Sequence, residues 1–135
     1  MKTGFCTAIA AGLIATAAPA QDEAKEERLV LPSGLEAYLQ EVLRQEGGEG
    51  APIVRARYVA EALEAGATLD EVSADLEYLC NADALPRIGE AAGEGVRIIV
   101  SLGDRPSDFG VPSPDVRQVF EAFTVESGLC IWEAF

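Results

Sequence analysis

The chain has no histidine and little positive charge. Its 135 residues include 23 acidic and 10 basic side chains, so the formal net charge at pH 7 is −13. Nucleic-acid binding requires a basic surface that displaces counterions from phosphates, and this charge excludes that class of function. The absence of histidine excludes Ser-His-Asp triads, Cys-His dyads and imidazole metal ligands. The length suits one domain without a large cofactor-binding fold.

Long hydrophobic runs are also missing, except at the N-terminus. There Lys2 precedes an apolar stretch over residues 5–17, and residues 18–20 (Ala-Pro-Ala) have the small-x-small pattern that signal peptidase cuts. A membrane-spanning helix needs about 20 apolar residues, more than this stretch offers. We therefore expect residues 1–20 to be a cleaved signal peptide, with export to the periplasm and no stable membrane insertion afterwards.

Cysteine is scarce as well. The chain has three cysteines, and cleavage after Ala20 would leave Cys80 and Cys130. It would also remove Lys2 but no acid, which takes the net charge from −13 to −14. In an oxidising compartment an even pair indicates a disulfide, and the C-x-x-C spacing of a redox-active pair is absent. We expect the Cys80–Cys130 disulfide, with two free thiols as the alternative.

The rest of the chain divides into a short leader and one domain. Residues 21–28 are almost wholly polar and contain no residue expected to anchor them, which predicts a disordered acidic leader. A single α+β domain is expected over residues 29–135. Neither segment shows the pattern of a metal site or of a cofactor site.

The clearest element of this domain is a helix that begins after Thr68. Thr68 and Glu71 have the spacing of a capping box. Five residues then follow on one apolar face: Leu69, Val72, Leu76, Leu79 and Cys80. Glu71, Asp75 and Glu77 are expected to face water. The helix should end near Ala82 or Ala84, before Pro86.

Strands are predicted over residues 53–60, 96–102, 118–125 and 129–135, where branched or alternating apolar residues occur. The last two are expected to form a terminal hairpin joined by residues 126–128 (Glu-Ser-Gly). Residues 35–44 fit both a helix face and a strand face, and their periodicity slightly favours a helix. One helix and four or five strands make a small antiparallel sheet with the amphipathic helix packed on one face. The disulfide would then tie the helix to the last strand.

Candidate contact residues lie in the irregular stretch that follows the strand over residues 96–102. Asp104, Arg105 and Asp108 are candidates for contact with a ligand or partner, although an arginine in such a loop more often closes a local salt bridge. Residues 108–110 spell the magnesium motif of kinases. A kinase also needs a strand lysine, and the only lysine after residue 20 is Lys25 in the leader.

Other residues are given structural roles. Arg55 and Arg57 are interpreted as one face of a strand, not as a patch. Trp132 is a candidate partner contact, although core packing is the commoner role of such aromatics, including Phe120, Phe123 and Phe135. Paired carboxylates are the only catalytic option that the composition allows, and no pair stands out. No catalytic residue is therefore assigned.

Several segments together resemble a known protein family. They are residues 31–34 (LPSG), 40–43 (QEVL), 79–80 (LC), 84–87 (ALPR), 101–102 (SL), 104–106 (DRP), 109–110 (FG), 120–123 (FEAF) and the ending 130–135 (CIWEAF). These resemble a family of small exported alphaproteobacterial proteins of unknown function. Some of its members carry an automatic label of acetolactate synthase, a large thiamine-diphosphate enzyme that so short a chain cannot be. The resemblance implies a strand for residues 35–44 and implies no activity or site.

Two functions of different classes follow from these observations. The first is a non-enzymatic periplasmic interaction or accessory module whose acidic surface meets a basic partner, either a periplasmic protein or the periplasmic face of a membrane complex. The second is a small-ligand binder or carboxylate-based enzyme that uses the loop around Asp104, Arg105 and Asp108. The charge and the missing catalytic constellation favour the first.

The disulfide gives the first testable prediction. Protein isolated after export and unfolded without reductant should show no thiol in a colorimetric thiol assay, because Cys80 and Cys130 are bonded to each other. After reduction the same sample should titrate two thiols. Two free thiols before reduction would contradict the pairing.

Overall fold

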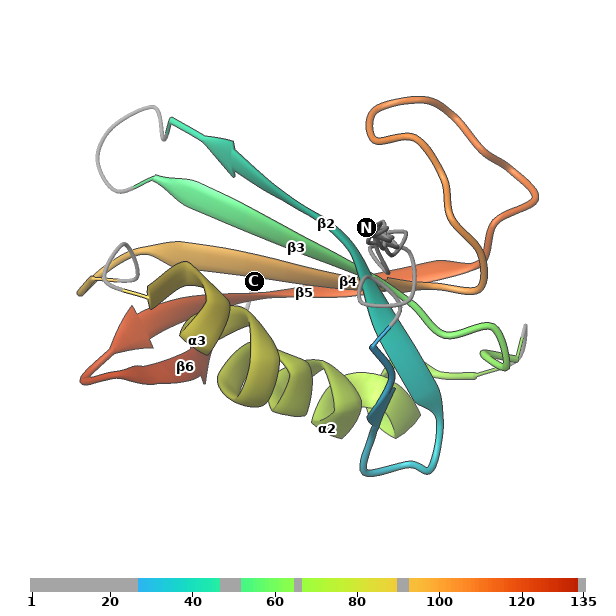
Figure 1. The fold of residues 1–135 in the computed structure, drawn as a ribbon, viewed down its shortest axis with the longest axis horizontal. Coiled ribbons are helices and arrows are strands. Elements are labelled where there is room, and N and C mark those ends of the chain that lie inside the picture. The colour runs from blue at the N-terminus through green and yellow to red at the C-terminus, as the bar shows by residue number, and fades with distance from the viewer. Residues whose placement is uncertain (1–26, 47–51, 65–66, 90–92, 134–135) are drawn as a thin grey trace, which may run out of the picture.

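The computed structural model describes residues 27–46, 52–64, 67–89 and 93–133. The predicted signal peptide and most of the predicted leader lie outside the described residues. The strands are β1 (Leu29–Val30), β2 (Glu36–Gln45), β3 (Ile53–Val59), β4 (Arg97–Gly103), β5 (Gln118–Glu126) and β6 (Leu129–Trp132). They form one curled sheet in chain order, from β1 at one edge to β6 at the other (Figure 1).

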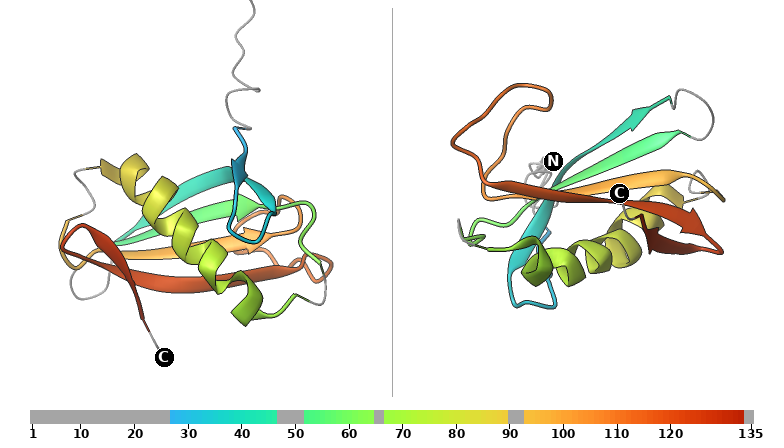
Figure 2. Two further views of the ribbon diagram at one scale, coloured as in Figure 1. Left: turned by 90° about the horizontal axis from the view of Figure 1, so that it is seen from below. Right: turned by 180° about the vertical axis from the view of Figure 1, so that it is seen from behind.

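The sheet is mixed, because β3 and β4 run parallel while every other neighbouring pair is antiparallel. Parallel neighbours need a long crossover connection, and here a helical segment supplies it. Figure 2 shows this segment crossing one face of the sheet. The predicted α+β class is therefore confirmed. The expectation of four or five antiparallel strands is wrong for the β3–β4 pair, and the two-residue β1 brings the number to six.

Residues 36–45 form strand β2, as the family resemblance implied, and the helical periodicity was misleading. The register of β2 against β3 shifts between Leu39 and Glu41, which marks a β-bulge. A bulge adds one residue and so breaks the two-residue alternation. Leu39 and Val42 consequently both pack against the core although they are three positions apart. Apolar residues three positions apart are also the pattern of an amphipathic helix, which explains the ambiguity of this segment.

The crossover begins where the sequence predicted. Thr68 caps helix α2 (Leu69–Leu79), and its capping box with Glu71 is present. The predicted end is wrong, since the helical path continues through the π-helical turn η1 (Cys80–Ala84) into α3 (Leu85–Ile88). Pro86 is tolerated because the π-helical turn before it shifts the hydrogen-bond register. Leu85 N donates to Cys80 O, five residues back, so the regular helical bonding is already interrupted at this point.

Asp75 faces the protein interior, not water as expected. Its side chain is fully buried, and its two carboxylate oxygens accept hydrogen bonds from Ser33, at 2.9 Å from the backbone N and 2.6 Å from Oγ. A buried carboxylate is tolerated when it is hydrogen-bonded in this way. Leu69, expected on the apolar face, is 45% exposed. Asp75 thus joins the turn after β1 to the middle of α2.

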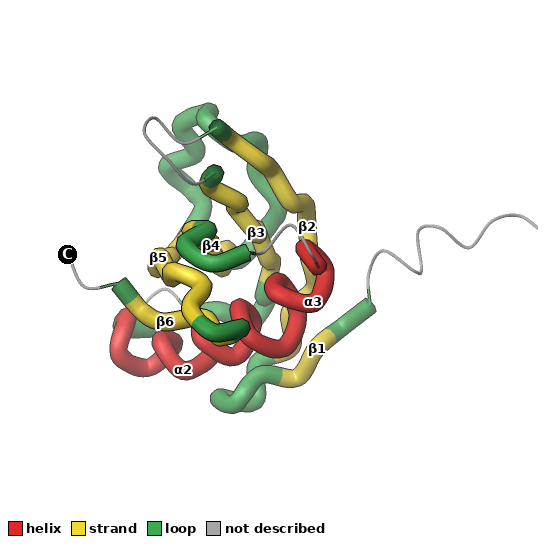
Figure 3. Tube along the Cα trace, turned by 90° about the vertical axis from the view of Figure 1, so that its left-hand side faces the viewer, coloured by secondary structure: helices red, strands yellow, loops and turns green. Residues whose placement is uncertain are grey.

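The core lies between the helices and the sheet, as Figure 3 shows with α2 and α3 lying to one side of the central strands. Alternate side chains of the central strands point into it, including Val54, Tyr58, Val100 and Phe123. Tyr58 is buried and its hydroxyl donates a hydrogen bond to Asp83, at 2.7 Å, in the π-helical turn. Burial and this contact raise the pKa of the Tyr58 hydroxyl.

The predicted disulfide is present and ties the helical segment to β6. The Sγ atoms of Cys80 and Cys130 are bonded, with 6.2 Å between their Cα atoms. Beside it, the Oδ1 atom of Asn81 accepts a hydrogen bond from the backbone N of Cys130 at 2.9 Å. The β5–β6 hairpin is confirmed too, with Ser127 and Gly128 at positive φ in a two-residue turn. Within the described residues, no helix is long and apolar enough to span a membrane.

The leader is anchored at its last residue, contrary to expectation. Arg28 forms an ion pair with Glu61 at 3.2 Å, and its guanidinium lies 4.9 Å from the ring centre of Tyr38. Residues 21–26 lie outside the described part of the chain.

Candidate functional site

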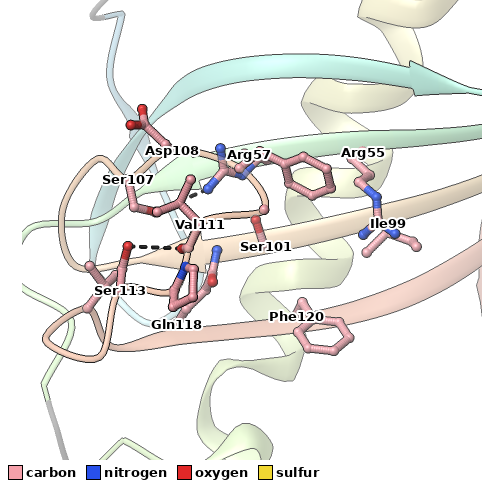
Figure 4. A pocket seen from close by; sticks show the side chains of 14 residues that line it. Arg55, Arg57, Ile99, Ser101, Ser107, Asp108, Val111, Ser113, Gln118 and Phe120 are labelled. Carbon is pink, nitrogen blue, oxygen red and sulfur yellow. Dashed lines mark hydrogen bonds between the residues drawn. The ribbon is translucent and has the colours of Figure 1, made fainter.

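A groove of about 400 Å³ lies on the sheet face opposite the helix, beneath the loop of residues 104–117 (Figure 4). Its floor comes from three neighbouring strands and its wall from the loop. The strand residues are Arg55 and Arg57 of β3, Ile99 and Ser101 of β4, and Gln118 and Phe120 of β5. The loop contributes Ser107, Phe109 and Val111, among others.

The alternation of strand side chains explains this set. Val54 and Ala56 point into the core, so the arginines between and after them must point to the opposite face. The parallel register then places Ile99 beside Arg55 and Ser101 beside Arg57. The loop covers the floor at this end, which turns an open sheet face into a groove.

Arg57 holds the loop to the sheet. Its side chain is buried, its Nη1 atom is paired with Glu41 of β2, and its Nη2 atom donates to Ser107 Oγ at 3.1 Å. Gln40 donates to the backbone O of Ser107 at 2.8 Å. Because of the bulge in β2, the consecutive residues Gln40 and Glu41 can both make contacts on the groove side of the sheet. Glu41 neutralises the charge of Arg57, so we assign Arg57 a structural role. We call its contacts with Glu41 and Ser107, which hold the loop to the sheet, the Arg57 clamp.

Arg55 is different, because no carboxylate of the described residues lies within ion-pair distance of it. Its Nε atom donates to Gln45 Oε1 at 2.7 Å, and its Nη atoms have no hydrogen-bond partner in that part of the chain. The guanidinium lies 5.2 Å from the ring centre of Phe109, and that of Arg57 lies 5.5 Å from the same ring. These distances are within the range of cation–π contacts.

Phe109 is presented by a tight turn. Val111 N donates to Asp108 O at 3.4 Å, and Gly110 between them has φ +81°, which suits glycine. The three residues that spell the kinase motif are therefore a turn that carries an aromatic ring to the groove. Phe109 is 46% exposed, and Val111 and Phe120 beside the groove are exposed as well.

Ser101 on the groove floor has an unsatisfied hydroxyl. The residue is 8% exposed, and its Oγ atom is buried without any hydrogen-bond partner among the described residues. Buried side-chain hydroxyls are nearly always bonded, so one that lacks a partner on a groove floor indicates a place for a polar group. Ser101 lies beside Arg57 on the groove floor, with Arg55 further along the groove (Figure 4).

The structure separates the contact residues that the sequence suggested. Asp104 lies at the base of the loop, where its Oδ1 atom accepts from Arg117 N at 3.2 Å. The exposed Arg105 forms a salt bridge with the same oxygen at 3.3 Å and does not line the groove. Asp108 does line it, but its carboxylate points away from the arginines (Figure 4). Only Asp108 of these three reaches the groove.

Trp132 lies on the other face of the sheet and is 57% exposed. It lines a second hollow of about 330 Å³ with the carboxylates of Asp70, Glu77 and Glu121. Burial raises the pKa of the Glu121 carboxyl above its usual range; a side-chain hydrogen bond with Trp132 opposes this shift, and the charges of Glu77 and Asp70 add to it. We call this hollow the Trp132 pocket.

The other three aromatic residues, for which core packing was expected, lie in different environments. Phe123 is a core residue, Phe120 is exposed beside the groove, and Phe135 lies outside the described residues. Among the described residues, no group of three or more cysteine, aspartate or glutamate side chains is placed to hold a metal ion.

The sequence interpretation missed Arg55, Arg57, Ser101 and Phe109 as site residues. One signal was present, namely two arginines and a serine on the non-core positions of two otherwise apolar strands. It could not be used without knowing that β3 and β4 are neighbours. The position of Phe109 depends on how the loop folds back, which no local pattern encodes.

The chain is similar to a known protein family. A model of a family of unknown function (DUF6497) matches residues 10–135. No curated protein and no solved structure matches the chain significantly.

The raised pKa of Glu121 gives a pH-dependent prediction. Folding favours its protonated form, so its contribution to stability is present below the unfolded pKa and is lost as pH rises through the folded pKa. The Glu121→Gln variant stays neutral throughout. Its free energy of unfolding relative to the wild type should therefore be higher at neutral pH than at acidic pH, measured by urea denaturation.

The matched control is Glu126→Gln, which removes an exposed carboxylate from the same strand. Its difference from the wild type should vary little with pH. A difference for Glu121→Gln that is equally independent of pH would contradict the interpretation.

Proposed function

The chain belongs to a family of unknown function (DUF6497), and from this premise we propose that the protein is an exported, non-enzymatic binding module. The groove on the open face of the sheet is its binding site. The observation that carries the proposal is the uncompensated Arg55 beside an exposed aromatic wall in a chain of net charge −13. A cationic side chain that is held but not neutralised is suited to meet a ligand.

A binding role fits the groove better than catalysis. Among the described residues, the only carboxylate lining the groove is that of Asp108, which points away from the arginines, so these residues offer no acid–base pair to a bound molecule. Ser101 has a hydroxyl without a partner, but no base in the described part of the chain is hydrogen-bonded to it to make it a nucleophile. The groove is nevertheless within the size range of small-molecule sites.

Export is supported by two independent features. The first is the predicted signal peptide at residues 1–20, and the second is the disulfide, which is typical of oxidising compartments such as the periplasm. The sequence resemblance to small exported alphaproteobacterial proteins agrees with both.

A screen of small fragments by NMR tests the binding function. Amide shifts of the isotope-labelled protein should change for residues lining the groove, and Phe109→Ala should abolish most of these changes because it removes the aromatic wall. The control Tyr78→Ala, which removes an exposed ring from helix α2, should leave them intact. Fragments that shift only residues elsewhere, or none, would contradict the proposal.

A second function is favoured by the Trp132 pocket. An exposed indole beside three carboxylates is suited to a lysine or arginine side chain, which agrees with an acidic surface that meets a basic partner. That partner would be a periplasmic protein or the periplasmic face of a membrane complex.

The second function predicts a salt-sensitive partner. A protein retained from periplasmic extract at low salt should be released at about 0.5 M salt, where charges are screened within about 4 Å. Trp132→Ala should reduce its retention, and Phe120→Ala, which removes an exposed ring from the opposite face, should not. If the immobilised protein retains nothing from the extract at low salt, this function is contradicted.

A further inference from the structure

We propose that the ligand of the groove is an organic monocarboxylate with an apolar body, and that Arg55 binds its carboxylate. This inference rests on the proposed binding function and adds the chemical class of the ligand. It uses three properties of the groove, namely the charge available, the apolar walls and the buried hydroxyl of Ser101.

The charge of the groove matches one negative charge. Glu41 neutralises Arg57, and the carboxylate of Asp108 points away from both arginines. The positive charge of Arg55 is therefore left to be balanced. The Nε atom of Arg55 is held by Gln45, so the side chain is positioned while its Nη atoms remain able to donate. A guanidinium recognises a carboxylate through charge-assisted hydrogen bonds, often with two parallel contacts.

Ligands of other charge fit less well. A cation would be repelled by Arg55, and a neutral apolar molecule would remove water from the guanidinium without replacing its hydrogen bonds, which is costly. A multiply charged anion would be repelled by the field of a chain of net charge −13. A single carboxylate satisfies Arg55 with the least repulsion.

The walls of the groove require an apolar body on that carboxylate. Phe109, Val111 and Phe120 are all exposed and all line the groove. Ile99 lies beside Arg55 on the floor, so apolar contacts begin immediately next to the charge. Covering such surfaces stabilises a complex in proportion to the apolar area removed from water, and a small anion such as acetate has too little apolar area to do so.

The buried hydroxyl of Ser101 is the independent sign of a ligand. It lies two residues beyond Ile99 on the same face of β4, about 7 Å along the strand. It can donate a hydrogen bond to an acceptor on a molecule that fills the groove, including a carboxylate oxygen with lone pairs left after it has accepted from Arg55. Ser101 thus adds a second, uncharged donor to the site.

Isothermal titration calorimetry of the exported protein with four defined probes tests the inference. Octanoate supplies a free carboxylate with an apolar chain, and an N-acetylated leucine tripeptide supplies the same chemistry as a peptide C-terminus. Octanol lacks the charge and acetate lacks the apolar body. Octanoate or the tripeptide should bind at least about tenfold more tightly than octanol and acetate; which of the two binds identifies the source of the carboxylate.

Two variants test the role of Arg55. Arg55→Gln should weaken carboxylate binding at least about tenfold, because charge-assisted hydrogen bonds are lost. The matched control Arg44→Gln makes the same change of net charge at an exposed position of the facing strand, opposite Val54, and should change affinity less than about twofold. Ser101→Ala, which keeps the charge, should weaken binding less than Arg55→Gln. Thermal melts of each variant check that it remains folded.

The outcomes separate this inference from the proposed function. Octanol binding as tightly as octanoate, or equal losses for Arg55→Gln and Arg44→Gln, would overturn the carboxylate assignment while leaving a ligand site in the groove. If neither octanoate nor the tripeptide binds but fragments in the NMR screen still shift groove residues, the ligand class is wrong and the site remains. If no probe or fragment reaches the groove, both are wrong.

Discussion

The parallel pairing of β3 with β4 is the constraint on which the rest of the structure depends. It requires a crossover, and the crossover brings α2, η1 and α3 across one face of the sheet. The opposite face is then left for the loop of residues 104–117 to cover. The same pairing sets the register that puts Arg55 beside Ile99 and Arg57 beside Ser101. An antiparallel arrangement of these strands would place different residues together and would not form this floor.

The arginines differ in whether a carboxylate neutralises them. Five of the eight arginines in the described part of the chain pair with a carboxylate within 4.0 Å, which is unsurprising in so acidic a protein. Arg117 instead donates to the backbone O of Ala67, and Arg44 is exposed. Arg55 alone of these eight combines a lack of a carboxylate partner with a position in the groove. The negative net charge therefore does not describe every part of the surface, because the groove carries an arginine without a carboxylate partner among the described residues.

Local patterns in the sequence predicted the elements that local interactions determine. Thr68 and Glu71 cap the helix because their spacing alone allows both hydrogen bonds. The turn at Ser127 and Gly128 depends on two residues and was equally readable. Residues 36–45 were ambiguous because the bulge near Leu39 replaces strand alternation by a three-residue spacing. Asp75 was placed in water because of its charge, although it lies three residues after Val72 and so on the buried face of α2. Its partner, Ser33, is distant in the sequence and could not be identified from the local pattern.

The groove depended on information that no local pattern holds, and its composition shows why. Glu41, Arg57 and Ser107 come from β2, β3 and the loop after β4, in that order. They meet only because of the β2–β3 hairpin and the crossover between β3 and β4. Once they meet, the Arg57 clamp fixes the loop and so holds the Phe109 turn over the floor. The alternation of β5 then connects the two candidate sites directly, because the neighbouring residues Phe120 and Glu121 point to opposite faces, one into the groove and one into the Trp132 pocket. The groove with Arg55 and the acidic Trp132 pocket therefore lie back to back across one sheet, so the proposed carboxylate ligand and the proposed basic partner would contact different side chains.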